Sequence, residues 1–550
     1  MIDVCPLSRV RIRRIDGETE WMASALSCTP LTAALLQNRG YNENRMNGAR
    51  ELLRPGPADI TFCVSALGDS AAKAAELWNA TKGGKVVVYG DYDTDGVCST
   101  VLAVEMALLH SDSVRYYIPH RHRQGYGVHG RVVRGIAQSR CDLLVVVDCG
   151  TRDVEALREA RKAGIPVIVF DHHVPGESLP EGVVVVNPHV EGDPAMKDLS
   201  AAGVIWAWAS ATGAAPVQWL ADRLDLVALA AVADYVPLDG VNRGLVSRGL
   251  SKMAAGKRKG LDSLLRTLRV PAGSVDEEDL SMKVIPCINA AGRLGLAEIA
   301  VGVLHGEKGF QRKVSELVDL NRKRQRLSAD ILSDVTPGLC EGRNHVLSDD
   351  TWHVGVLSAV ASRLCSISGR AVALAAPAGS GVRGTLRVPQ GGDALGVLKE
   401  LSDHLEAWGG HRQAAGFSVS TEQWPEVQCE MEKILSGIEA VEEVMNLVEF
   451  DPSRVDDALL RDIRRIGPFG QGNPKPLLYC GRDGEPSFTP LGKDGRHVRV
   501  KTRDTEFLAF DGVAVSDAIK SSHGLIYRPR KSWWAGRYRL DFLLEGVVET

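Results

Sequence analysis

The sequence predicts an α/β protein with a parallel sheet in its first half, a second α/β unit and a small C-terminal β-barrel. Three observations support this fold class. Short apolar runs of strand length alternate with helical spacing after residue 85. Residues 310–335 contain neither Gly nor Pro and keep helical spacing throughout, which predicts one long connecting helix. Beyond residue 441, short strand-like runs are separated by Gly, Pro and Asp, a pattern typical of small barrels.

The length of the chain requires several domains. Its 550 residues are too many for one core, and 44% hydrophobic with 24% charged residues is an ordinary globular composition. We predict a mostly helical segment at 1–80, the parallel-sheet domain at 81–305, the connecting helix at 306–337, the second α/β unit at 338–440 and the barrel at 441–550.

The parallel-sheet domain is predicted from its alternating elements. Apolar, β-branched runs predict strands at 86–89, 114–118, 143–147, 167–170 and 183–186. A helical pattern covers 154–163, and residues 201–233 are alanine-rich and helical. Strands that alternate with helices imply right-handed crossovers and a doubly wound parallel sheet.

The stretch KVVVYGDYDTDGVCSTVLAVEMALL, residues 85–109, carries the strongest chemical signal. Its strand ends at Gly90, and Asp91, Asp93 and Asp95 follow at alternate positions before a helix begins. Carboxylates this close repel one another unless a cation or protons bind there. A solvated acidic turn is the simpler alternative. An EF-hand loop is excluded because Leu102 stands where a bidentate Glu is required, and because a strand leads into the turn.

Other predicted strands end in similar groups. Asp148 follows the strand at 143–147, the strand at 167–170 runs into Asp171, His172 and His173, and Asp234 ends an apolar segment. Each alone could be a helix cap, but together they predict a site for Mn²⁺ or Mg²⁺ at one sheet edge. Successive strand residues point to opposite sides, so we expect one imidazole to bind metal and the other to contact substrate.

Net charge and cysteine content limit what can be said about the partners and the cellular compartment of the protein. The net charge of −4 neither favours nor excludes nucleic acid, because metal ligands count as negative. Eleven cysteines without a CxxC pair favour reduced thiols in a cytoplasm. The apolar runs are too short for a membrane span, and the N-terminus lacks the apolar segment of a signal peptide. We expect a cytoplasmic monomer with no membrane contact.

Ordered motifs carry a family resemblance. DYDTDG, DCG, DHH and ADYVPL, at 91–96, 148–150, 171–173 and 233–238, resemble the motifs of the DHH phosphoesterase superfamily. INAAGRLG, WHVGVLSAVASRL, GGHRQAAGFS and IGPFGQGNPKP, at 288–295, 352–364, 409–418 and 466–476, are similar to signatures of its RecJ family. The resemblance implies a DHH catalytic domain, a DHH-associated substrate-binding domain and an OB-type barrel.

The resemblance also implies an activity and its partners. It implies a metal-dependent 5′-to-3′ exonuclease that hydrolyses single-stranded DNA to 5′-mononucleotides in DNA repair and recombination. It brings a helicase and a single-strand-binding protein into consideration as partners. One alternative is a phosphodiesterase of the same superfamily acting on short oligonucleotides or cyclic dinucleotides, against which the predicted barrel argues. Another is a non-catalytic scaffold that binds single strands, against which the complete set of carboxylates argues.

Residue roles follow from the matched motifs. The resemblance implies two divalent ions (Mn²⁺ or Mg²⁺) with Asp148 bridging them. The catalytic groups that it implies are Asp91, Asp93, Asp95, Asp148, His172, His173 and Asp234. All of these except His173 would be metal ligands. It implies substrate contacts, including the 5′ phosphate, at Arg121, His173, Arg293, Thr385, Arg387 and His411. Cys287 and Thr385 depart from the family pattern, which usually has Arg and Ser there. The first departure puts substrate affinity in doubt, and the second keeps a hydroxyl.

Basic and aromatic residues in the predicted barrel favour strand binding. The candidates are Arg496, Arg499, Lys501, Arg528, Trp533 and Trp534. A solvated charged face with core aromatics is the alternative.

Overall fold

The computed structural model describes residues 2–53, 60, 62–121, 123–340, 345–441, 444–492, 495, 497–503, 505–510, 512–534 and 537–549. The chain forms two compact units. The larger unit comprises Ile2–Val318 together with Asn446–Thr550, and the smaller unit comprises Asp319–Met445. Within the described residues, none of the helices combines the length and apolar character that crossing a bilayer requires.

The core of the larger unit is a five-stranded, all-parallel sheet in the order β4-β3-β5-β6-β7. The strands are β3 (Val86–Tyr89), β4 (Val114–Tyr117), β5 (Leu143–Val147), β6 (Val167–Phe170) and β7 (Val184–Val186). The predicted parallel sheet is therefore confirmed. Its three central strands, β3, β5 and β6, are buried along their whole length, as expected of strands with both faces covered.

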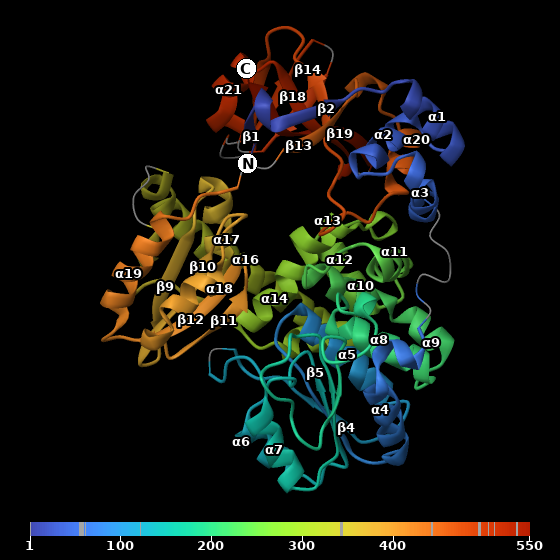
Figure 1. Cartoon of the computed structure of the whole chain (residues 1–550), viewed down its shortest axis with the longest axis vertical. Coiled ribbons are helices and arrows are strands. Elements are labelled where there is room, and N and C mark those ends of the chain that lie inside the picture. The colour runs from blue at the N-terminus through green and yellow to red at the C-terminus, as the bar shows by residue number, and fades with distance from the viewer. Residues whose placement is uncertain are drawn as a thin grey trace. The chain divides into compact units, whose positions relative to one another are not determined.

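Helices cover both faces of this sheet, as Figure 1 shows. Valines of β3, β5 and β6 that point to one face pack against α6 and α7. The helices nearest the sheet are α4 (Asp69–Ala80), α5 (Thr94–Ala107), α6 (Gly130–Gln138), α7 (Val154–Lys162) and α8 (Ala201–Thr212). The alternation of strands and helices places every βα turn at the same sheet edge.

A helical region follows the sheet, as predicted. It consists of α9 (Val217–Asp222), α10 (Leu224–Ala233), α11 (Gly240–Ala254), α12 (Lys259–Thr267), α13 (Glu277–Asp279), a π-helix at Leu280–Val284, α14 (Ile285–Leu294) and α15 (Glu298–His305). The predicted long helix is α16 (Phe310–Cys340), which leads from the larger unit into the smaller one.

The smaller unit is the second α/β unit. Its five-stranded mixed sheet has the order β11-β12-β10-β9-β8. The elements are β8 (Val346–Ser348), α17 (Val354–Ser368), β9 (Val372–Ala378), β10 (Gly381–Arg387), α18 (Ala394–Glu400), β11 (Ala407–His411), β12 (Ala414–Ser420) and α19 (Trp424–Ser436). One continuous core joins this sheet to α18 and α19.

The C-terminal part of the larger unit is a nine-stranded sheet in which seven strands come from the C-terminus. They are β13 (Met445–Glu449), β14 (Leu478–Gly481), β15 (Ser487–Leu491), β16 (His497–Lys501), β17 (Glu506–Ala509), β18 (Gly524–Trp534) and β19 (Arg537–Glu549). Two helices accompany them, α20 (Asp457–Arg464) and α21 (Ser516–Ser521).

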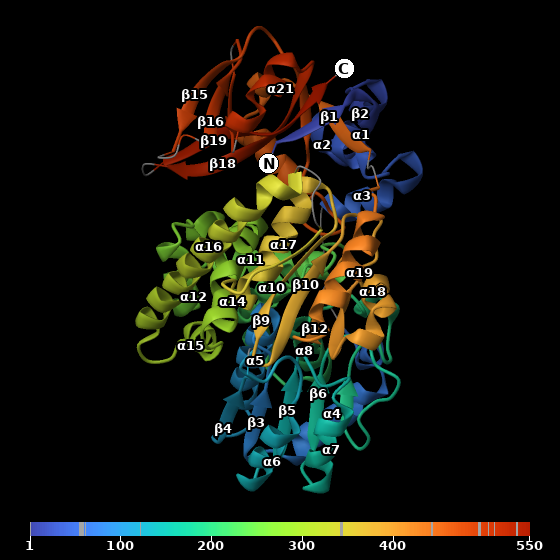
Figure 2. The ribbon, with the colours of Figure 1, turned by 90° about the vertical axis from the view of Figure 1, so that its left-hand side faces the viewer.

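The N-terminal segment is mostly helical, as predicted, but it also contains two strands that the sequence did not indicate. Besides α1 (Gly17–Leu26), α2 (Pro30–Asn38) and α3 (Met46–Leu53), it forms two strands, β1 (Asp3–Pro6) and β2 (Val10–Arg13). β1 pairs with β19 and β2 with β13, so both strands complete the C-terminal sheet, beside which they appear in blue in Figure 2. These short strands are stabilised by partners at the other end of the sequence, which no local pattern reveals. The two ends of the chain share one hydrophobic core.

Candidate metal centre

Three carboxylates meet at the carboxyl edge of the parallel sheet. Asp91, Asp148 and Asp171 follow the neighbouring strands β3, β5 and β6, and each is no more than 2% exposed. The Asp148 N–H donates to the carbonyl of Phe170 at 2.9 Å, which continues the strand ladder to the turn. Asp148 has a φ of +62°, a conformation that aspartate tolerates better than most residues.

Helix α5 presents two more carboxylates at this edge. Asp93 is the N-cap of α5, and its Oδ1 accepts a hydrogen bond from the Gly96 N–H at 3.0 Å. Asp95 accepts from the backbone N–H groups of Ala201 and Ala202 at 2.7 and 3.1 Å, at the start of α8. The positive end of α8 therefore stabilises the charged form of Asp95.

These side chains form two groups that could each hold a metal ion. The first group is Asp91, Asp93 and Asp148, and the second group is Asp95, His172 and Asp234, with ligand atoms within 4.8 Å of one another in each. His172 links them, because its Nε2 lies 3.4 Å from Oδ1 of Asp148 while its Nδ1 lies 3.5 Å from Oδ2 of Asp234. The structure thus brings all six predicted metal ligands together.

The carboxylates of the two groups repel one another because they carry like charges. Burial, and after it the charge of Asp93, raises the pKa of Asp91 well above its usual value. Burial and the charge of Asp95 do the same to the pKa values of Asp148 and Asp234. Such repulsion is relieved by a bound cation or by protons.

The donor set fits divalent cations. Oδ1 of Asp91 is buried and has no hydrogen-bond partner among the described residues. Carboxylate and imidazole groups suit Mn²⁺ and Mg²⁺, and sulfur ligands do not appear in either group. The two groups could therefore hold a pair of such ions, with Asp148 beside both.

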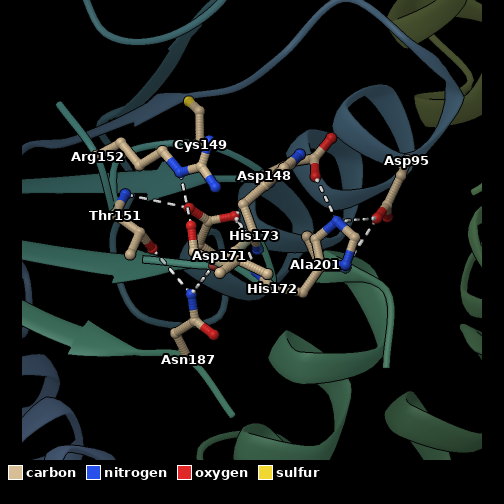
Figure 3. A network of polar contacts seen from close by, with 12 residues as sticks. Asp95, Asp148, Cys149, Thr151, Arg152, Asp171, His172, His173, Asn187 and Ala201 are labelled. Carbon is tan, nitrogen blue, oxygen red and sulfur yellow. Dashed lines mark hydrogen bonds and ion pairs between the residues drawn. The ribbon is translucent and has the colours of Figure 1, made fainter. Parts of the chain in front are cut away.

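His173 belongs to a hydrogen-bonded network beside these groups, shown in Figure 3. Its Nδ1 lies 2.8 Å from Oδ1 of Asp171, and the hydroxyl of Tyr126 lies 3.2 Å from its Nε2. Burial alone would lower the pKa of His173, but the hydrogen bond and charge of Asp171 raise it to about 9. A protonated imidazole at this position can face a phosphate.

The two histidines correct one sequence argument. Strand β6 ends at Phe170, so the alternation of side chains does not extend to His172 and His173. Their rings lie 4.6 Å apart, and both approach Asp148. The division of roles between them therefore depends on Asp171. Its carboxylate contacts the imidazole ring of His173, whereas it contacts His172 only through the backbone N–H.

Sequence reasoning assigned no role to two residues of this network, Asp171 and Tyr126. Asp171 accepts hydrogen bonds from the backbone N–H groups of His172 and Thr151 as well as from His173. Its position after a buried strand was the available signal. Tyr126 also donates to the Asp148 carbonyl at 3.2 Å, but a single tyrosine in a glycine-rich loop gave no comparable signal.

The predicted phosphate ligands of the larger unit lie on segments next to the Asp91 turn. The Arg121 guanidinium stacks 5.0 Å from the ring centre of Tyr92. Arg293 lies in the last turn of α14, which packs so closely that a Cβ on Gly292 would lie 2.4 Å from the Tyr92 carbonyl oxygen. Cys287, on the same helix, is fully buried.

The smaller unit holds the other three predicted substrate residues. On β10, Thr385 is buried, and its Oγ1 accepts a hydrogen bond from Arg387 at 3.0 Å. Arg387 also donates to Ser358 and Ser362 of α17, at 2.6 and 2.8 Å. His411 ends β11 and is exposed.

The predicted nucleic-acid residues of the C-terminal sheet lie in different settings. Arg499 and Lys501 are on β16, and Arg499 Nε lies 3.6 Å from Glu506. Arg528 is largely buried and forms ion pairs with Glu278 and Glu545, both at 2.9 Å. Its guanidinium is therefore already engaged. Arg496 and the side chains of Trp533 and Trp534 lie outside the described residues.

Comparison with protein families matches three separate segments of the chain. Residues 85–231 match the DHH family, N-terminal domain, residues 342–437 match the DHHA1 domain, and residues 448–546 match the RecJ OB domain.

Similar proteins cover most of the chain. The single-stranded-DNA-specific exonuclease RecJ of Escherichia coli (strain K12) is 33% identical over 510 residues, covering 86% of each chain. The RecJ of Bacillus subtilis (strain 168) is 29% identical, and this chain spans 64% of its length. The crystal structure of RecJ with Mn²⁺ from Thermus thermophilus superposes with a TM-score of 0.77 at 28% identity, covering 98% of this chain and 79% of that one.

Proposed function

The chain belongs to the RecJ family of single-stranded-DNA-specific exonucleases, and from this we propose that it is a metal-dependent enzyme that hydrolyses single-stranded DNA in the 5′-to-3′ direction to 5′-mononucleotides. The observation that carries the proposal is the pair of carboxylate and imidazole groups that meet at Asp148. Hydrolysis of a phosphodiester needs both an activated water and relief of negative charge. Two groups that can each hold a divalent cation could meet both needs.

The first and second groups would hold Mn²⁺ or Mg²⁺, through Asp91, Asp93 and Asp148 on one side and Asp95, His172 and Asp234 on the other. Two bound ions would activate water and neutralise charge on the phosphodiester. The protein residues have separate tasks. The α8 N-terminus fixes Asp95, and the Asp171 carboxylate keeps His173 protonated toward the scissile phosphate.

Substrate orientation would come from arginines. A guanidinium binds phosphate oxygens through two parallel N–H donors, which fixes position as well as charge. We assign this task to Arg121 and Arg293 in the larger unit, and to Arg387 with Thr385 and His411 in the smaller unit. A seated 5′ phosphate would determine which bond is cut and so give the reaction its direction.

The setting is part of the proposal. Ten cysteines in the described part of the chain are free thiols, which supports a reducing, cytoplasmic environment. The C-terminal sheet matches the RecJ OB domain and supports binding of single-stranded DNA, with Arg499 and Lys501 as candidate phosphate contacts. We propose that the enzyme acts as a monomer in DNA repair and recombination, downstream of a helicase and alongside a single-strand-binding protein.

The test is digestion of single-stranded DNA labelled at either end. Substrates with a 5′ phosphate and a 5′ hydroxyl are incubated with Mn²⁺, with Mg²⁺ or with a chelator. We expect mononucleotides released from the 5′ end, faster from phosphorylated DNA, and no product with chelator. Release from the 3′ end, or chelator-resistant activity, would contradict the proposal. Cleavage restricted to dinucleotides would identify the short-oligonucleotide alternative.

A further inference from the structure

Asp234 is held differently from the other carboxylates of the two groups. It caps the C-terminus of helix α10, whereas Asp91 and Asp148 follow strands and Asp93 and Asp95 lie at the start of α5. Its side chain is 31% exposed, against 3% for that of Asp148. The position of its carboxylate therefore depends on the segment that follows, residues 234–239, which we call the Asp234 loop.

The Asp234 loop begins with a strained residue, and its later residues are held by contacts from outside the loop. Tyr235 has a φ of +57°, which is unfavourable for a bulky side chain and persists only where the surroundings enforce it. The Tyr235 side chain is 71% exposed and cannot supply this restraint. Val236 and Leu238 point inward and are 6% and 3% exposed. The Val236 N–H donates to the carbonyl of Ala231 at 3.2 Å, which holds the start of the loop to α10, whereas Leu238 is held by contacts from elsewhere in the chain.

Leu238 and its neighbour Pro237 are contacted by residues 466–473, which we call the linker loop. The Leu238 N–H donates to the carbonyl of Gln471 at 2.7 Å. A Cβ on Gly470 would lie 2.7 Å from Cδ1 of Leu238, and one on Gly472 would lie 3.4 Å from Cβ of Pro237. Gly470 therefore permits an approach to Leu238 that a residue with a Cβ would disturb, while Gly472 leaves ordinary contact distance to Pro237.

The linker loop is closed by its own side chains. The Nδ2 of Asn473 donates to the carbonyls of Ile466 and Pro468 at 2.7 and 2.8 Å. The Phe469 N–H donates to Oε1 of Glu277 at 3.0 Å. The two Asn473 bonds close the loop on itself, and the bond to Glu277 attaches it to α13.

Arg39, from the N-terminal segment, holds the linker loop in turn. Its Nε donates to Oδ1 of Asn473 at 3.0 Å, and its Nη2 donates to the carbonyl of Pro474 at 2.7 Å. A third bond runs from Nη1 to the carbonyl of Leu35 at 3.0 Å. Burial lowers the pKa of Arg39 to about 10, which leaves it charged at neutral pH.

We propose that Arg39 and the linker loop are positioning elements for Asp234, and that they set the affinity of the second group for a divalent cation. The chain of contacts runs from Arg39 through Asn473 and the linker loop to Leu238, four residues from the carboxylate. Both ends of the polypeptide thus determine the geometry of a ligand in its middle. The inference rests on the proposed function in that Asp234 binds a cation.

The first test is Mn²⁺ binding to the full-length chain, measured without substrate from the electron paramagnetic resonance signal of free Mn²⁺. Gly470→Ala forces a Cβ against the buried Leu238 side chain and displaces the Asp234 loop. Changes in residues that orient metal ligands cost about 10–100-fold in metal affinity, so we expect a loss on the order of 10-fold. The control is Gly481→Ala on β14, where a Cβ meets nothing within 4 Å, and its affinity should be unchanged.

A second variant covers the case in which Gly470→Ala does not fold. Arg39→Lys keeps the charge but cannot make the three bonds of the guanidinium. It should also weaken Mn²⁺ binding, and a retained cooperative urea transition shows that the variant is folded. Unchanged Mn²⁺ affinity in the folded variants would overturn the inference.

A double-mutant cycle separates this inference from the proposed function. If Gly470→Ala acts through Asp234, it should have no further effect on Mn²⁺ affinity in an Asp234→Ala background. Equal loss in both backgrounds would show that the linker loop does not act through Asp234. If Asp234→Ala alone leaves Mn²⁺ binding intact, the metal assignment of Asp234 fails instead.

Discussion

Asp148 and Asp234 show two ways of placing a carboxylate in one site. Asp148 follows a buried strand that is paired on both sides, and its backbone N–H continues the ladder to Phe170. Asp234 ends a helix and is followed by a strained residue, and contacts from residues far away in sequence hold its loop. The first position is determined by local sequence and sheet topology. The second depends on how distant parts of the chain pack.

The different ways in which Asp148 and Asp234 are held predict which of the two metal groups tolerates distant substitutions. A ligand at the edge of a buried sheet moves only if the sheet moves, because close-packed interiors resist displacement. A ligand on a loop that is held by distant residues can move when any of those residues is changed. Substitutions far from the metal groups should therefore affect the second group more than the first.

The largest effect is expected for Asp148→Ala. Asp148 contributes to the first group and approaches His172 of the second, so its removal weakens both. Metal ions contribute several kcal/mol to stabilising the transition state, and a loss of about 4 kcal/mol lowers kcat on the order of 10³-fold. Rates are measured on 5′-phosphorylated single-stranded DNA. Binding of that DNA in a gel-shift assay should remain, and normal turnover in the folded variant would contradict the metal assignment.

Arg528→Ala tests the support that comes from distant residues. Arg528 pairs with Glu278, and both side chains are largely buried, at 13% and 15% exposed. Removing Arg528 takes both of its hydrogen bonds from Glu278 and leaves that carboxylate only Lys475 at 3.1 Å and Arg530 at 3.9 Å, which we expect to cost about 3 kcal/mol. The free energy of unfolding in urea should fall accordingly. Arg503→Ala, whose pair with Asp483 is exposed, should cost less than about 1 kcal/mol.

The same variant has a pH signature. Burial would raise the pKa of Glu278, but Arg528, together with Lys475 and Arg530, outweighs burial and holds it at about 2, below the ordinary 4.5. A depressed carboxyl pKa stabilises the fold above the unfolded-state pKa, and that contribution is lost as pH falls from about 4.5 toward 2. The gap in unfolding free energy between parent and variant should narrow over this range. A constant gap would show that Arg528 acts by packing rather than by charge.

The fold and the site were predictable where their determinants lie close together in sequence. An apolar run followed by an acidic residue identified β3, β5 and β6 and, with them, Asp91 and Asp148. Strand β1 was missed because it is short, mostly exposed and paired with β19 at the opposite end of the chain. Arg528 was interpreted as a nucleic-acid contact because its partner Glu278 is distant in sequence.

Tyr126→Phe tests the local network beside the first group. The variant keeps the ring but removes the hydroxyl that reaches His173 and the Asp148 carbonyl. A hydrogen bond to a charged group contributes about 1.5–3 kcal/mol, so kcat should fall about 10-fold or more while KM changes little. Steady-state kinetics on a 5′-phosphorylated oligonucleotide measures both. Tyr116→Phe, which removes a hydroxyl bonded to Glu307, is the control and should leave kcat unchanged. A rise in KM alone would place Tyr126 in substrate binding.

The smallest effect is expected for Thr385→Ser. Thr385 lies within β10 between β9 and β12, and its Oγ1 accepts from Arg387 and donates to the carbonyl of Ala415. Serine keeps both bonds and loses one buried methyl group, which costs about 0.8 kcal/mol of stability, so KM for 5′-phosphorylated DNA should stay within about 2-fold. Thr385→Val keeps the shape but leaves Arg387 and Ala415 without this partner, and an unmet buried hydrogen bond costs about 1–3 kcal/mol. Valine should therefore raise KM for phosphorylated DNA more than serine does. Equal behaviour of the two variants would mean that the hydroxyl does not orient Arg387, and that the position is fixed by strand packing alone.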